Sequence, residues 1–307
     1  MSVVLVVVGL VGLYLGGELL VRNASALART LGISPMVIGL TVVAFGTSAP
    51  ELAATLVAAL RGAPELALAN VVGSNVANVG LILGLTALAY PLVASWSFLR
   101  REVPWMLAAT VLAMPLLYDG RLGRLEGLVL WAALVVFLVA AMRSGGPLAP
   151  GPRPAGERPG RAWRTVLGVA AGVAVLAYGA QALVAGATAL AQAWGVPERV
   201  IGLTLVAIGT SLPELASSLV AALRRETDII LGNIVGSNLF NLLAVLGTAA
   251  IVHPIAVPPA GLRVDLWIML AFALAIVPLL LLGRRLGRRD GALLLVAYLA
   301  YVGWLFA

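Results

Sequence analysis

The chain contains no cysteine and no lysine, a single histidine, and few charges of any kind. The absence of cysteine excludes disulfides and thiolate metal sites, and gives no indication of the redox compartment. Only 11% of the residues are charged, whereas 62% are hydrophobic and the mean hydropathy is +1.06. A soluble fold of 307 residues could not bury so much apolar surface. The composition therefore predicts an integral membrane protein.

Apolar stretches of roughly 20 residues, long enough for helices that cross a bilayer, recur along the chain. The first has no basic segment before it and no convincing cleavage site, so we expect a mature helix rather than a signal peptide. The predicted fold is an all-α membrane protein with ten transmembrane helices. Their expected ranges are 2–21, 36–60, 66–90, 104–118, 125–142, 163–191, 199–223, 228–252, 265–283 and 291–306.

All 20 basic residues are arginines, and they lie outside the apolar stretches or at their edges. If the segment after the fifth stretch is cytoplasmic, the arginines divide between the two sides in a ratio of about 15 to 5. The positive-inside rule then predicts an inner (plasma) membrane protein with both termini outside the cytoplasm. This distribution also explains the net charge of +7 without nucleic acid as a partner.

A segment rich in proline, glycine and arginine, residues 144–162, divides the chain into two halves, 1–143 and 163–307. The halves align without a gap in the register that pairs Glu51 with Glu214, called the repeat register below. About 29 of the 48 positions from Val37 to Gly84 are identical in the second half. With five spans each, an odd number, the halves are predicted to be inverted relative to each other, which is an architecture of transporters.

Glu51 and Glu214 lie in the middle of predicted spans, each at the end of a GTSxPE string. An ionised carboxylate at that depth costs several kcal/mol unless it is compensated. No arginine lies in the middle of any predicted span, so a bound cation is the natural partner. The alternative is a pair of protonated carboxylates in a packed bundle.

The proline before each glutamate cannot donate a backbone hydrogen bond and should break the helix. The break frees backbone carbonyls in the stretches 44–47 and 207–210, close to the carboxylates along the chain. Thr47 and Glu51 are four residues apart, which puts them on one helical face, and Thr210 and Glu214 repeat this spacing. Ser48 and Ser211 are adjacent to these threonines.

The next span of each half adds hydroxyl and amide oxygens, from Ser74 and Asn78 in GSNVAN and from Ser237 and Asn241 in GSNLFN. Hydrogen bonding between helices is the alternative role for these four side chains. Oxygen ligands without cysteine or histidine select hard cations such as Ca2+ or Na+. Two carboxylates would neutralise one Ca2+, and the same residues could instead hold Na+ or protons, which would give antiport.

The paired GTSAPE/GSNVAN and GTSLPE/GSNLFN strings resemble the two alpha-repeats of the sodium/calcium exchanger family, prokaryotic type, within the cation/calcium exchanger superfamily. The resemblance covers nearly the whole chain and implies ten helices around a central cluster of ion sites, with no cofactor besides the transported ions. It implies that Glu51 and Glu214 bind Ca2+ together with the carbonyls of Thr47 and Thr210. The residues implied near flanking Na+ sites or near the centre are Ser48, Ser211, Ser74, Ser237, Ala44, Ala207 and Asn78.

Asn241 departs from the family pattern, because related chains often carry aspartate at this position. With two carboxylates rather than three, exchange of Ca2+ for protons by the same glutamates stays open beside exchange for Na+. Two remote alternatives are a cation channel and an intramembrane serine enzyme that uses Ser48 or Ser211, although no histidine or lysine base lies in mid-span. We expect the lipid bilayer and the ions as partners, with no enzyme activity and no obligate protein partner.

Three further polar residues are interpreted as structural. Glu18, near the inner end of the first span, is expected to bond to a neighbouring helix or to Arg22. Asn75 and Asn238 are one residue away from the serine and asparagine face, and are expected to tie backbone near the broken helices.

Overall fold

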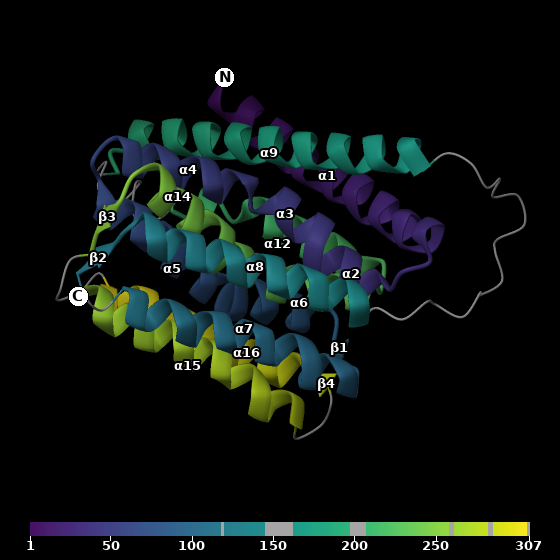
Figure 1. Ribbon diagram of the computed structural model, residues 1–307. Coiled ribbons are helices and arrows are strands. Elements are labelled where there is room, and N and C mark those ends of the chain that lie inside the picture. Colours follow the sequence, from purple (N-terminus) through teal and green to yellow (C-terminus); the bar gives the residue numbers. More distant parts are fainter. Residues whose placement is uncertain (118–119, 145–161, 197–206, 258–260, 282–284, 306–307) are drawn as a thin grey trace, which may run out of the picture. The chain divides into compact units, whose positions relative to one another are not determined.

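The structure is a computed structural model that describes residues 1–117, 120–144, 162–196, 207–257, 261–281 and 285–305 (Figure 1). It is almost entirely helical, and the chain forms two compact units. Unit 1 comprises Met1–Thr47 and Ala140–Asn233, and unit 2 comprises Ser48–Val139 and Ile234–Ala307. Each unit therefore draws on both halves of the sequence. Residues 145–161, nearly all of the predicted linker, lie outside the described residues.

Two long helices, the first part of one broken helix and a second broken helix make up most of unit 1. The first helix continues to Leu31, beyond the predicted end at residue 21, because its last turns bury Ala24, Leu27 and Ala28. A left-handed Gly32 then ends it, as is typical of helix C-termini. The elements are α1 (Ser2–Leu31), α2 (Pro35–Ile38), the π-helix η1 (Gly39–Val43), α3 (Ala44–Thr47), α9 (Ala162–Ala193), α11 (Ala207–Gly209), α12 (Leu212–Leu223) and the start of α13 (Thr227–Leu239).

Helices α1 and α9 pack closely over most of their length, through glycines on both (Figure 1). A Cβ atom on Gly172 would lie 2.6 Å from the backbone nitrogen of Leu20, and one on Gly16 would lie 2.6 Å from the backbone nitrogen of Leu176. Near the other end of the pair, Gly186 approaches the carbonyl oxygen of Ser2. The order of these contacts shows that the two helices are antiparallel. Small residues allow this backbone approach, as is common between membrane helices.

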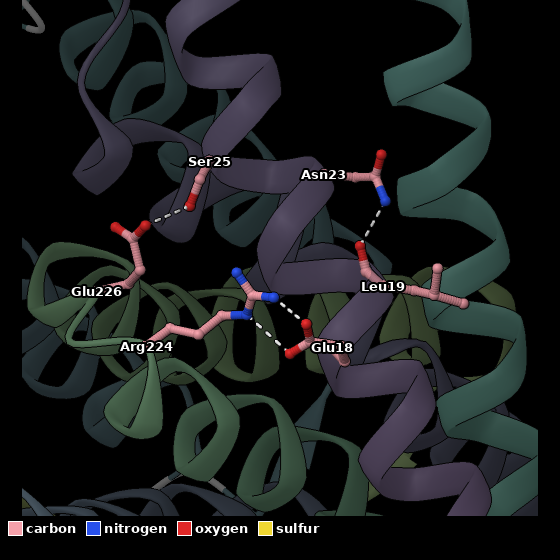
Figure 2. A network of polar contacts seen from close by, with 6 residues as sticks. All are labelled: Glu18, Leu19, Asn23, Ser25, Arg224 and Glu226. Atoms are coloured by element: carbon pink, nitrogen blue, oxygen red, sulfur yellow. Dashed lines mark hydrogen bonds and ion pairs between the residues drawn. The ribbon is translucent and has the colours of Figure 1, made fainter. Parts of the chain in front are cut away.

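A set of polar contacts joins α1 to the turn that follows α12 (Figure 2). The carboxylate of Glu18 accepts two hydrogen bonds from the guanidinium of Arg224, one of them from Nε at 2.7 Å. Two helical turns further along α1, Ser25 Oγ donates to Glu226 Oε1 at 3.0 Å. The expectation that Glu18 bonds to a neighbouring element is confirmed, with Arg224 rather than Arg22 as its partner.

Unit 2 contains the remaining helices. The π-helix η4 is buried at every position and contacts α4, α5 and α7. The elements are α4 (Ala49–Leu60), α5 (Pro64–Ala77), the π-helix η2 (Asn78–Leu83), α6 (Gly84–Ala89), α7 (Trp96–Leu116), most of α8 (Arg124–Ser144), the end of α13, η4 (Phe240–Val245), α14 (Leu246–Val252), α15 (Gly261–Leu281) and α16 (Arg288–Leu305).

Two short antiparallel ladders connect loops of unit 2, which the expectation of a purely helical fold did not include. Strand β1 (Leu92–Val93) pairs with β4 (Arg285–Leu286), and Leu92 lies opposite Leu286. Strand β2 (Arg121–Leu122) pairs with β3 (Ile255–Ala256), and Leu122 lies opposite Ile255. All four apolar residues of these pairs are buried. Each ladder therefore ties a loop of the first sequence half to a loop of the second.

Six helices of the described residues are long and apolar enough to cross a membrane, or seven if the bent pair 35–47 and 49–60 counts as one span. The chain is thus a multi-pass membrane protein. Helices also occupy the described parts of all ten predicted ranges. Helices α7 and α16 are long enough but too charged to be counted among the six, because α7 contains the charged run 100–102 and α16 begins with two arginines and an aspartate. Ten spans and the inversion of the halves stay predictions.

Candidate cation site

The two GTSxPE strings form the same local structure. Ser48 and Ser211 interrupt their helices with nearly identical backbone angles, φ −81° and ψ 4° against φ −89° and ψ 5°. Helices α4 and α12 begin directly afterwards, with their prolines in the first turn where a missing N–H costs nothing. Glu51 and Glu214 also lie in these first turns, at the positive end of the helix dipole. The break predicted from the prolines is present in both halves.

Both glutamates are buried, each with only 1% of its surface exposed. Burial at this level disfavours an ionised carboxylate unless a cation, a proton or strong hydrogen bonds compensate its charge. Among the described residues, no three histidine, cysteine, aspartate or glutamate side chains cluster to hold a metal ion. A cation bound at either glutamate would therefore need neutral oxygens for the rest of its ligands.

Neutral oxygens do precede each break. Ala44 and Thr47 form the ends of α3, and Thr47 is completely buried. The hydroxyl of Thr47 lies 3.4 Å from the carbonyl oxygen of Ala44 and 3.3 Å from Oδ1 of Asn233. In the second half, Ala207 begins α11, and Thr210 and Ser211 follow that helix directly. Ser48 and Ser211 are each 3% exposed.

Unit 2 holds the GSNVAN and GSNLFN residues. Asn78 is the first residue of η2 and Asn241 is the second residue of η4, so each amide lies at a π-helical turn, a feature found often at functional sites. Ser74, Asn78, Ser237 and Asn241 are all buried. Because α4 contacts both α5 and η4, and α5 contacts η4, the helices that carry Glu51, Ser74 and Asn241 pack together within this unit.

Several buried polar atoms of unit 2 have no hydrogen-bond partner among the described residues. They are Nδ2 of Asn78, Oγ of Ser237, both amide atoms of Asn241, Oδ1 of Asn75 and Oγ1 of Thr86. Leaving such an atom unsatisfied in a buried place costs about 1–3 kcal/mol. Buried groups of this kind usually have a partner, such as an ion or an ordered water. The amide nitrogens of Asn75 and Asn238 each donate to the carbonyl four residues earlier at 2.7 Å. These are structural contacts, but they lie within α5 and α13 and not at the broken helices.

Two asparagines that lie three residues before the GSNVAN and GSNLFN strings, Asn70 and Asn233, were not identified as functional from the sequence. Asn70 Nδ2 donates to the backbone carbonyl of Glu51 at 3.2 Å and to Thr55 Oγ1 at 2.8 Å. Asn233 Nδ2 donates to the hydroxyls of Ser217 and Ser218, at 3.3 and 3.2 Å. The pairing of these two asparagines in the repeat register is the sequence feature that could have indicated a role. They lie one helical turn before Ser74 and Ser237, outside the predicted ligand set.

Comparison with known proteins agrees with this architecture. The sequence profile described as sodium/calcium exchanger protein matches residues 1–143 and 164–307. The inner membrane protein YrbG of Escherichia coli K12 is 38% identical over 324 residues, which cover 99% of this chain and 98% of YrbG. The sodium/calcium exchanger MaX1 of Methanosarcina acetivorans is 32% identical over 341 residues, which cover 98% of this chain and 97% of MaX1.

A solved structure has the same fold. It is the sodium-calcium exchanger NCX_Mj soaked with 10 mM Na+ and no Ca2+, and it superposes with a TM-score of 0.87 at 29% identity. The match covers 98% of both chains. With the profile match over both halves and the long alignments to YrbG and MaX1, the chain belongs to the sodium/calcium exchanger protein family.

Proposed function

We propose that this protein exchanges Ca2+ for Na+ across the membrane by alternating access, with Glu51 and Glu214 as the charged ligands of the transported ions. The observation that carries the proposal is the duplicated break, in which each buried glutamate follows a serine of the same backbone conformation. A carboxylate retained twice in an apolar span has a cost that a cation would offset. MaX1 and NCX_Mj are named as exchangers of sodium and calcium, which supports this choice of ions.

Neutral oxygens would complete the coordination in this proposal. Ca2+ accepts six to eight oxygen ligands, whereas the two carboxylates supply at most four. The carbonyls of Thr47 and Thr210 would bind Ca2+ beside the glutamates, and the remaining residues would serve mainly Na+. Those residues are Ala44, Ala207, Ser48, Ser211, Ser74, Ser237, Asn78 and Asn241.

Charge balance explains why occupancy would be exclusive. Two glutamates neutralise one Ca2+, so a site holding Ca2+ has no negative charge left for Na+. In the absence of Ca2+ the same carboxylates would attract Na+ or protons. Since the site could be closed off from water on both sides at low cost only when its charge is compensated, the empty form would be disfavoured during the change of access. Obligatory exchange follows from that penalty.

The sequence repeat supports alternating access as the transport mode. Inverted repeats allow two states in which the halves exchange conformations, and this opens one common site to either side in turn. The inversion is part of the proposal, as is the orientation in which both termini lie outside the cytoplasm and residues 144–162 inside. YrbG is named as an inner membrane protein, which supports the same membrane for this chain.

Exchange of Ca2+ for protons is the second candidate, and Asn241 is the observation that favours it. This buried side chain is an amide, so the proposed site has two carboxylates. Two glutamates could release two protons for each Ca2+ bound, without any Na+ site. Na+ coupling is preferred because of the family to which the chain belongs.

Reconstituted protein can separate the two candidates. Proteoliposomes loaded with Na+ are diluted into medium with radioactive Ca2+, and a second set carries a pH gradient and choline in place of Na+. Uptake that depends on internal Na+ supports the proposal. Uptake driven by the pH gradient alone would move the assignment to proton coupling. Glu214→Gln should abolish uptake of either kind. Glu65→Gln, at an exposed residue of α5, removes the same charge outside the site and is its control.

A further inference from the structure

A buried polar cluster in unit 1 centres on Asn233, a residue outside the proposed ligand set. Asn233 lies in α13 and is 1% exposed. Its amide contacts Thr47 from the first half of the sequence and Ser217 and Ser218 from the second. All three partners are at most 1% exposed. No solvent is therefore needed to satisfy this side chain.

The amide of Asn233 uses its donors and its acceptor on different helices. Its Oδ1 accepts from Thr47 Oγ1 at 3.3 Å, and its Nδ2 donates to Ser217 Oγ and Ser218 Oγ. The hydroxyl of Ser217 in turn donates to the backbone carbonyl of Glu214 at 3.0 Å. A continuous chain of hydrogen bonds thus runs from Thr47 to the first turn of α12, where Glu214 lies.

The hydroxyl of Thr47 has two acceptors and only one hydrogen. Oδ1 of Asn233 lies 3.3 Å away and the carbonyl oxygen of Ala44 lies 3.4 Å away. When the hydrogen points to Asn233, the Ala44 carbonyl keeps its lone pairs for another partner. When it points to Ala44, that carbonyl already accepts a hydrogen bond and is a weaker ligand for a cation.

We propose that Asn233 is a positioning residue for cation binding, which holds the Thr47 hydroxyl away from the Ala44 carbonyl and links it to the turn that carries Glu214. This inference rests on the proposed function, because that proposal makes Ala44, Thr47 and Glu214 ion ligands. It adds a residue that does not itself touch the ion. The consequence is that loss of Asn233 weakens cation binding through Thr47.

The first half of the sequence contains a related arrangement in unit 2. Asn70, at the position equivalent to Asn233, donates to the backbone carbonyl of Glu51 at 3.2 Å. It also donates to Thr55 at 2.8 Å, and Thr55 is equivalent to Ser218 in the repeat register. In each half, an asparagine is therefore bonded to the first turn after the break, directly at Glu51 and through Ser217 at Glu214. This duplication is an independent reason to assign these amides to the site.

If Asn233 acts by positioning Thr47, the effect of replacing it on cation binding should depend on the Thr47 hydroxyl. If Asn233 is only structural, its replacement should have the same effect with or without that hydroxyl. Asn233→Leu replaces the amide with an apolar group of similar size. In that variant the Thr47 hydroxyl has only the Ala44 carbonyl as acceptor, so cation binding should fall. In a Thr47→Val background the competing hydroxyl is gone, and the same change at Asn233 should have little further effect.

The measurement uses purified full-length protein titrated with NaCl alone and with CaCl2 alone, at ionic strength held by choline chloride. Binding is followed as the cation-dependent rise in the unfolding midpoint of tryptophan fluorescence. We expect Asn233→Leu to raise the half-saturating Na+ concentration roughly threefold to tenfold, the loss expected from one hydrogen bond. In Thr47→Val protein, Asn233→Leu should raise the half-saturating Na+ concentration by less than about twofold. Asn233→Ala serves in its place if the leucine variant does not fold.

The outcomes are distinct. Equal weakening in both backgrounds, or no weakening at all, would overturn the positioning role. If wild-type protein responds to Ca2+ and not to Na+, the Na+ coupling of the proposed function fails, and the same cycle with Ca2+ decides the role of Asn233. A wild-type protein that responds to neither cation would overturn both, and this is visible before any variant is made.

Discussion

Glu18 of α1 and Arg224, which follows α12, form a bidentate ion pair, although 206 positions separate them in the chain (Figure 2). Both side chains are about one-third exposed, at 32% and 36%. Exposed pairs contribute about 0.2–1 kcal/mol, and pairs of arginine with a carboxylate in this geometry are the stronger ones. In the repeat register, Gln181 occupies the position of Glu18 in the second half, so the pair has no ionic equivalent there.

Glu18→Gln should therefore lower the free energy of unfolding by about 0.5–1 kcal/mol at low salt, and by less in high choline chloride because salt screens the pair. The exchanged pair Glu18→Arg with Arg224→Glu should recover part of this loss. Thermal unfolding in detergent at two ionic strengths measures it. Arg29→Gln removes an exposed charge from the same helix and is the control. A loss of the same size at both salt concentrations would show that the charge interaction is not its source.

Close packing of α1 against α9 gives a second prediction. In Gly172→Ala the new methyl group would lie 2.6 Å from the backbone nitrogen of Leu20, which cannot move without shifting the helix. Overpacking of this kind costs about 1–3 kcal/mol. We expect a lower unfolding midpoint and slower Ca2+ uptake. Gly303→Ala is the matched control, since a Cβ there meets nothing within 4 Å. Equal behaviour of the two variants would contradict the close approach.

A third prediction compares two buried asparagines of the GSNLFN string, Asn238 and Asn241. Asn238 donates a hydrogen bond of 2.7 Å to Ile234, whereas neither amide atom of Asn241 has a partner among the described residues. Asn241→Ala should weaken Na+ binding about tenfold and cost little stability beyond the volume that it removes. Asn238→Ala should mainly reduce stability. Sodium titrations and unfolding midpoints of both variants check this. The reverse pattern would show that Asn238, and not Asn241, serves the ion.

Much of this architecture was predictable because it depends on local sequence and on duplication. The apolar stretches predicted the helices, and Pro50 and Pro213 predicted the breaks at Ser48 and Ser211. The alignment of the halves alone indicates Glu51 and Glu214 as the paired carboxylates. These features need only helix chemistry and the cost of a buried charge.

Other features depend on contacts between distant segments, which the sequence does not encode locally. The π-helices η2 and η4 look like any apolar helix in sequence, and the two-residue strands are too short for a pattern. Arg224 as the partner of Glu18 follows only from how α1 lies against the end of α12, and Thr47 as the partner of Asn233 only from how α3 lies against α13. Asparagine is common at packed helix contacts, so its presence alone did not indicate a role beside the ion ligands.

Na+-driven Ca2+ uptake into proteoliposomes tests most directly whether Glu51 and Glu214 bind the transported ions. Wild-type protein should take up Ca2+ only when Na+ is present inside. Glu51→Gln and Glu214→Gln should each reduce the initial rate by about a hundredfold or more, because loss of one charged partner of a buried ion costs about 3–5 kcal/mol. Glu65→Gln should keep the wild-type rate. Ca2+ uptake that persists in both the Glu51→Gln and the Glu214→Gln protein would contradict the account.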